Sequence, residues 1–182
     1  PKIVDVVKTA SSTMIAKTCS SCGQDLSWQR DFLVCTNHSS CPAQMENTLE
    51  HFFKIHGQVD GFGSKSIEKL VAGGIDTLEK IYSSNEEDFI NVGFGPGQSK
   101  NLRRELDRSI SVDTEDWRFL GAFGIPQLGR GDSRRLLQHF RIADFAKITQ
   151  EEIMEIEGFA EISSADIIQG LSKRWSTIHH ML

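Results

Sequence analysis

The sequence lacks any long hydrophobic run. None of its apolar stretches approaches the roughly 20 residues that a membrane-spanning helix needs. The N-terminus also lacks a basic patch leading into an apolar segment, which a secretion signal would have. The 182 residues are 38% hydrophobic and 25% charged, a composition typical of globular proteins. These absences argue against a membrane partner, and we expect a cytoplasmic protein.

The chain also lacks an overall positive charge, since its formal net charge is −5. That total argues against nucleic-acid binding, which depends on Lys and Arg. The charges are unevenly distributed, however. Residues 97–110 and 127–145 each carry four basic residues against two acidic ones, whereas 151–166 hold six acidic residues and no basic one. Either basic stretch alone is equally well interpreted as a solvated helix face.

Cysteine is absent after the first quarter of the chain. All four cysteines lie within a short segment with the spacing Cys19-x2-Cys22-x12-Cys35-x5-Cys41. Two short chelating loops joined by a hairpin can supply four thiolates to one tetrahedral ion, so the pattern predicts one structural Zn²⁺. We expect the hairpin strands at 26–29 and 32–34, with the turn at 30–31. A closed shell of four thiolates leaves no position for water or substrate, so this zinc would stabilise the fold rather than catalyse.

Other interpretations of the cysteines remain open. Two disulfides would suit a secreted protein, but no secretion signal is present. Four unligated thiols are a second alternative. His38, inside the second loop, could replace one thiolate ligand.

A unit of about 32 residues recurs four times after the cysteines. Its signature is an apolar residue between two positions that are mostly glycine, then a packing residue four places after the second of these and Leu or Ile after seven. Apolar-periodic sequence precedes and follows each signature, which predicts a helix, a short hairpin and a second helix. The signatures begin at Gly61, Gly93, Gln127 and Gly158.

Glycine at such a hairpin permits a tight turn and leaves backbone N–H groups uncovered at the start of the second helix. Uncovered amides at the positive end of a helix bind anions. The anion that such hairpins usually meet is a phosphate of the DNA backbone, and this contact does not depend on the base sequence. We expect the middle residues to pack in the core. The predicted DNA contacts are Gly61, Gly63, Lys65, Gly93, Gly95, Lys100, Arg103, Gly129, Arg130, Arg134 and Arg135.

The third and fourth repeats depart from the signature. Gln127 occupies the first glycine position of repeat three, although basic residues follow it. Ala160 occupies the second glycine position of repeat four, which lies in the acidic stretch. We therefore expect repeat four to contact DNA weakly or not at all. A purely structural array of helices is the alternative for all four repeats.

The four cysteines followed by Pro42 and four such repeats resemble the C-terminal half of bacterial-type NAD-dependent DNA ligases. Further shared motifs are Gly61-Phe62-Gly63-x3-Ile67-Glu68-x-Leu70 and Leu120-Gly121-x2-Gly124-Ile125. The resemblance implies a mainly α fold: the last strand and linker of an OB domain over 1–17, a four-cysteine zinc finger and connecting helix over 18–56, and a helix-hairpin-helix DNA-binding domain over 57–182. It also implies a bacterial or phage-encoded source.

The resemblance further implies a role in nick sealing during DNA replication and repair. The family transfers AMP from NAD to a lysine, then to the 5′-phosphate, and seals the nick with the 3′-hydroxyl. The chain has no Lys-x-Asp-Gly motif, since its one Asp-Gly, Asp60-Gly61, has Gln58 at the lysine position. We therefore expect no catalytic residue and no bound NAD here. Nicked double-stranded DNA and the ligase's adenylation and OB domains are the expected partners, and a downstream BRCT domain is not found in this sequence.

Two rival functions remain open. The chain could be a separately encoded DNA-binding subunit that serves a catalytic chain in trans. It could also be a repair or recombination scaffold that combines zinc and helix-hairpin-helix modules, which would bind protein partners and show no preference for nicks.

Overall fold

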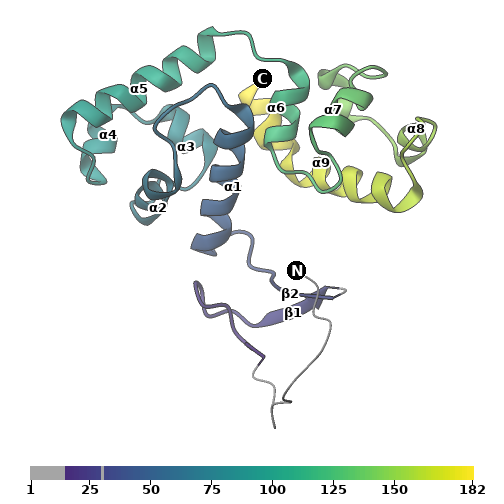
Figure 1. The fold of residues 1–182 in the computed structure, drawn as a ribbon, viewed down its shortest axis with the longest axis horizontal. Helices are drawn as coiled ribbons and strands as arrows, with labels where there is room; N and C mark the ends of the chain where they lie inside the picture. The colour runs from purple at the N-terminus through teal and green to yellow at the C-terminus, as the bar shows by residue number, and fades with distance from the viewer. Residues whose placement is uncertain (1–14, 30) are drawn as a thin grey trace, which may run out of the picture.

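The computed structural model describes residues 15–29 and 31–182, which form a small β-hairpin module below a larger helical body (Figure 1). The predicted mainly α fold class is therefore confirmed. The strand expected near the N-terminus lies outside the described residues.

The β-hairpin consists of β1 (Leu26–Gln29) and β2 (Phe32–Cys35), which pair antiparallel with Leu26 opposite Cys35. Both strands fall where the sequence predicted them. Two of their large side chains are exposed to solvent, Trp28 by 60% and Phe32 by 71%. Because so little apolar surface is buried, the hairpin cannot depend on a hydrophobic core for its stability.

The helical body follows directly from the cysteine loops. Its elements are α1 (Pro42–His56), α2 (Ser64–Ala72), α3 (Leu78–Ser83), α4 (Glu86–Asn91), α5 (Pro96–Ser111), α6 (Asp116–Ala122), α7 (Arg130–Leu136), the 3₁₀ helix η1 (Ile142–Ala146), α8 (Gln150–Met154) and α9 (Glu161–Met181).

Four helix-hairpin-helix units account for most of these elements, as the sequence predicted. Their helix pairs are α1–α2, α4–α5, α6–α7 and α8–α9. Each second helix begins immediately after the second signature position, so its N-cap is Gly63, Gly95, Gly129 or Ala160. The short helices α3 and η1, which the repeat pattern did not predict, link repeat one to two and repeat three to four. Helices α1 and α6 pack together in the middle of the body (Figure 1).

One continuous core runs through the four units. The middle residue of every hairpin is buried, as expected, and so are the positions four and seven residues after each second-helix N-cap. The hairpin residues are Phe62, Phe94, Leu128 and Phe159. Phe62 stacks on Phe53 of α1, with ring centroids 4.4 Å apart. The hairpins are therefore fixed to the helices by apolar burial and not by turn hydrogen bonds alone.

A basic side chain joins the two repeats within each half of the body. Lys69 of α2 donates to the Gly93 carbonyl at 2.9 Å and lies 4.7 Å from the centroid of the Phe94 ring. Arg135 of α7 lies 5.6 Å from the centroid of the Phe159 ring. Lys69 and Arg135 are both six residues after their helix N-caps, so the repeats are organised as two similar pairs.

Within the described part of the chain, no helix combines the length and the apolar character that crossing a membrane requires.

Candidate metal centre and nucleic-acid interface

The four cysteines converge on one point between the hairpin and the start of α1. Their Sγ atoms all lie within 4.8 Å of one another. The Sγ atoms of Cys19 and Cys41 are 3.9 Å apart, and those of Cys22 and Cys35 are 3.6 Å apart. A tetrahedral ion with thiolate bonds of about 2.3 Å requires Sγ atoms about 3.8 Å apart, whereas a disulfide requires about 2.05 Å. The arrangement fits a four-thiolate metal site, and all four cysteines are free thiols.

Local backbone structure holds the first pair of thiols in place. Gly23 has φ +72°, a left-handed conformation that glycine adopts readily. Its N–H donates to the Cys19 carbonyl at 2.9 Å, and the Cys19 N–H donates to the Gln24 carbonyl at 2.7 Å. The chain therefore turns tightly after Cys22, which brings the thiols of Cys19 and Cys22 to the same side.

The thiols differ in acidity because of their surroundings. Backbone N–H groups of Cys22 and Ser21 lower the pKa of Cys19 to about 7. At Cys35 the Asn37 N–H lowers the pKa, but desolvation and the neighbouring cysteines raise it more, to about 11. A bound metal ion would favour the thiolate form of Cys35, because its positive charge stabilises the ionised sulfur.

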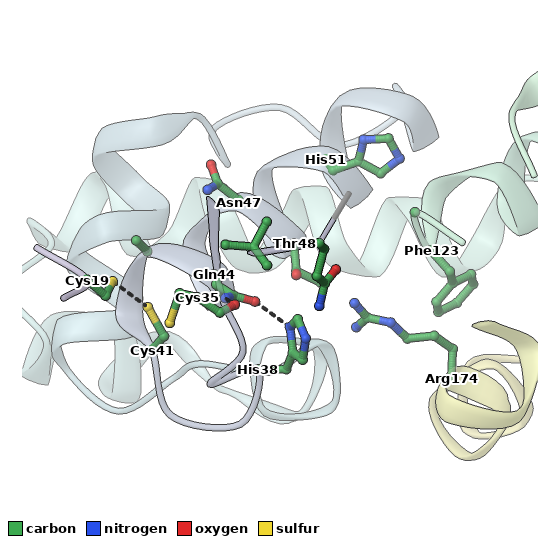
Figure 2. A pocket seen from close by; sticks show the side chains of 14 residues that line it. Cys19, Cys35, His38, Cys41, Gln44, Asn47, Thr48, His51, Phe123 and Arg174 are labelled. Carbon is green, nitrogen blue, oxygen red and sulfur yellow. Dashed lines mark hydrogen bonds between the residues drawn. The ribbon is translucent and has the colours of Figure 1, made fainter. Parts of the chain in front are cut away.

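His38 does not belong to the thiol cluster, and its imidazole makes a hydrogen bond to another side chain. Its Nδ1 pairs with Oε1 of Gln44, while the Gln44 amide also donates to the Cys35 carbonyl (Figure 2). The Ala43 N–H donates to the Ser21 hydroxyl at 3.2 Å. These contacts attach the cysteine loops to the first turn of α1, which therefore determines the module's orientation relative to the helical body.

An open pocket of about 620 Å³ lies between the cysteine module, α1, the α6–α7 turn and α9. Arg174 of α9 extends into it, and the lining includes His38, Thr48 and His51 but no acidic residue (Figure 2). Burial lowers the pKa of Arg174. The residues that line this pocket are widely separated along the chain, so the sequence alone does not indicate it.

The first signature position of every repeat has a left-handed backbone. Its φ is +90° at Gly61, +97° at Gly93 and +94° at Gly158. Gln127 has φ +61° and is the one non-glycine residue with positive φ within the described ranges. The alignment of Gln127 with the three glycines is therefore structurally correct, and repeat three keeps the turn despite the substitution.

The second signature position has a different reason for being glycine. Gly63, Gly95 and Gly129 have φ of −81°, −70° and −75°, which any residue adopts. All three are exposed, and a Cβ built there would meet nothing within 4 Å. Neither backbone conformation nor packing inside the chain requires glycine at these positions. Glycine there instead leaves the helix N-terminus open to close approach from outside.

Repeat four differs at its second position. The Ala160 N–H donates to the Ser163 hydroxyl at 2.9 Å, so a side chain of the repeat itself occupies that amide. Within the described part of the chain, no side chain accepts a hydrogen bond from the N–H of Gly63, Gly95 or Gly129, the equivalent N-cap residues. Their first amides remain available to an external anion.

The predicted basic contacts fall into distinct environments. Lys65, Lys100, Arg130 and Arg134 are exposed on the second helices of repeats one to three. Arg135 is directed to repeat four, and Asp132 lies 3.4 Å from its guanidinium. These positions agree with a basic surface on the first three repeats, but Arg135 also has a structural role.

Arg103 differs from the expectation that it faces DNA. Its side chain is only 18% exposed, and its guanidinium donates to the carbonyls of Tyr82 and Ser84 at 2.9 and 2.7 Å. It also pairs with Asp107 at 2.8 Å. Arg103 therefore satisfies the carbonyl end of α3, a role that sequence reasoning missed because α3 itself was not predicted.

Comparison with known proteins agrees with this architecture. Residues 57–108, which run from the hairpin of repeat one into α5 of repeat two, match the family described as "SAM-like Helix-hairpin-helix tandem". The whole chain is 45% identical to a protein named DNA ligase from Desulfatibacillum aliphaticivorans and spans 29% of it. It is 46% identical over 175 residues to a DNA ligase of Desulfotalea psychrophila, and 32% identical over 167 residues to one of Wolinella succinogenes. These alignments cover 94% and 90% of the chain, and 26% and 25% of the two relatives.

The repeats and the family match define the chain as a helix-hairpin-helix protein with an attached four-cysteine module. Along its whole length it is related to one part of bacterial proteins named DNA ligase, so the resemblance found in the sequence is confirmed. The chain spans less than a third of the length of these relatives.

Proposed function

We propose that this chain is the DNA-binding part of an NAD-dependent DNA ligase and grips duplex DNA around a nick through backbone phosphates. The adenylation domain that would seal the nick, in replication and repair, is provided by another part of the protein. In this proposal the chain neither binds NAD nor catalyses, and it acts in the cytoplasm of a bacterium or phage-infected cell.

The observation that carries the proposal is the open helix N-terminus at Gly63, Gly95 and Gly129. Glycine at these positions is explained neither by φ nor by packing, since each has an ordinary φ and an unobstructed Cβ direction. A phosphate bound by the first helical amides needs this space, because a side chain would hold it away from the N–H groups. Exposed cations nearby, Lys65 and Arg134, favour the same ligand.

We further propose that the metal ion is zinc and that its role is structural. Four thiolates at tetrahedral spacing are a typical zinc ligand set and leave no open coordination position. Cys19, Cys22, Cys35 and Cys41 would hold the ion and thereby stabilise a hairpin that has little core of its own. The chemistry supplied by the metal is cross-linking of the two loops.

The test compares the chain with variants at equivalent hairpin positions. Gly63→Val and Gly95→Val each place a branched side chain over the proposed phosphate site. Ala160→Val is the matched control, because it makes a similar change at a helix N-cap whose amide is already occupied. A charge-assisted hydrogen bond contributes about 1.5–3 kcal/mol, so we expect each glycine variant to bind duplex DNA about ten- to a hundredfold more weakly.

Binding is measured on nicked and intact duplexes across a salt series, with zinc content determined on the same samples. One zinc per chain and an affinity that falls steeply with salt are expected. If both glycine variants bind as tightly as Ala160→Val, the hairpins are not the phosphate contacts. Equal affinity for nicked and intact duplexes would favour the recombination scaffold.

A further inference from the structure

Repeat three contains an arginine that is supported by a tryptophan. The guanidinium carbon of Arg134 on α7 lies 3.7 Å from the ring centroid of Trp117 on α6. Arg134 is exposed, while Trp117 is half-buried. In the described part of the chain, Arg134 has neither an ion pair nor a side-chain hydrogen bond. A guanidinium stacked on an aromatic face keeps its edge N–H groups free to donate.

The spacing of residues on both helices explains this stack. Trp117 and Gly121 are four residues apart on α6, and Arg130 and Arg134 are four residues apart on α7. Residues with that spacing share one helix face. A Cβ on Gly121 would lie 3.6 Å from Cγ of Arg130, an ordinary contact distance, so Gly121 lies where α6 packs against α7. Both arginines therefore emerge along the same α6–α7 contact.

Two other arginines around this contact, Arg118 and Arg135, lie near acidic residues. Arg118, whose guanidinium carbon is 5.3 Å from the Trp117 ring centroid, lies 3.6 Å from Glu115. Arg135 lies 3.4 Å from Asp132 and is directed to repeat four. Arg134 is thus a cation that is ordered by the protein and has no acidic partner among the described residues.

We propose that Trp117 is a positioning residue that holds Arg134 ready to bind a backbone phosphate of duplex DNA. The inference rests on the proposed DNA-binding function and concerns the repeat in which Gln127 replaces the first glycine. A free arginine side chain loses rotamer freedom when it binds, which weakens binding. Stacking on Trp117 restricts Arg134 before DNA arrives, so less freedom is lost on binding.

A double-mutant cycle on the whole chain tests this role. The proteins are the unaltered chain, Trp117→Leu, Arg134→Gln and the double variant, with Trp117→Phe retaining an aromatic face. Affinity for a fluorescent nicked duplex is measured across a salt series, and the thermal midpoint of each variant establishes that it is folded. Gly63→Val serves as an independent measure of hairpin binding.

We expect Trp117→Leu to weaken binding about three- to tenfold, with Trp117→Phe in between. Trp117→Leu removes no charge and leaves the salt dependence unchanged, whereas Arg134→Gln lowers its slope by about one. In the Arg134→Gln background, Trp117→Leu has no further effect. Equal loss in both backgrounds would show that Trp117 is merely structural and would overturn the inference. If the unaltered chain binds no duplex, or if Gly63→Val has no effect, the proposed function fails instead.

Discussion

Gly158 provides a sharp test of the hairpin geometry, because two separate contributions oppose a side chain there. Its φ is +94°, and a Cβ would collide with Nη1 of Arg135. Gly63 is the matched control, since its φ is −81° and nothing lies within 4 Å of its Cβ direction. The perturbation is Gly→Ala at each position.

The expected magnitude follows from these geometries. Left-handed backbone costs an L residue about 1–2 kcal/mol. Displacing Arg135 from the Phe159 ring costs about 0.5–1 kcal/mol more, and the reduced entropy of the unfolded chain returns about 0.4–1 kcal/mol. Gly158→Ala should therefore lower the free energy of unfolding by about 1–2 kcal/mol. Gly63→Ala should change it by less than about 0.5 kcal/mol.

Urea unfolding followed by far-UV circular dichroism measures the difference. In an Arg135→Ala background the steric contribution disappears, so Gly158→Ala should become less costly while the backbone contribution remains. Equal stability of Gly158→Ala and Gly63→Ala would refute the assignment of a left-handed turn at the first position only. An unchanged cost in the Arg135→Ala background would refute the contact between Arg135 and Gly158.

Three further outcomes are expected. Cys35→Ser, or treatment with a chelator, should unfold the cysteine module while the helical body stays folded. Tryptophan fluorescence and circular dichroism would distinguish the two transitions, and simultaneous loss of both signals would contradict this expectation. Arg103→Met should lower the free energy of unfolding by about 1–3 kcal/mol, because the carbonyls of Tyr82 and Ser84 lose a charged hydrogen-bond donor. The salt dependence of DNA binding should stay unchanged. Burial, reinforced by the charge of Arg118, lowers the pKa of His56 in the folded protein. As the pH falls below about 6.5, the unfolded state therefore binds a proton more readily than the folded state does. The free energy of unfolding should decrease over this pH range. His56→Phe should flatten that part of the urea-unfolding stability profile, and an unaltered profile would rule out His56 as its source.

The sequence predicted the repeats well because each signature combines constraints that act locally. Glycine at Gly61 and Gly93 is favoured by a left-handed turn, and the apolar residue that follows packs in the core. The start of α7 was placed correctly even though Gln127 breaks the pattern, because the spacing from Leu128 to Leu136 was preserved. Such short-range spacing survives single substitutions.

Side-chain contacts between helices could not be predicted in the same way. Arg103 belongs to a basic stretch, and only the fold brings it to the carbonyls that end α3. The pairing of Trp117 with Arg134 likewise depends on how α6 packs on α7. From charge alone, such residues are assigned to the surface, whereas their partners are determined by how the helices pack on one another.

The open N-termini after Gly63, Gly95 and Gly129 belong to helices that share one continuous core, so their spacing is fixed. A ligand that occupies one of them meets the others at a high effective concentration, provided that its own anions are spaced to match. The combined affinity of three individually weak sites then depends on the shape of the ligand. Free phosphate or a flexible single strand would gain little affinity from this arrangement, whereas a stiff polymer with regularly spaced charges would bind several sites at once. Bending such a polymer would detach it from the sites one at a time.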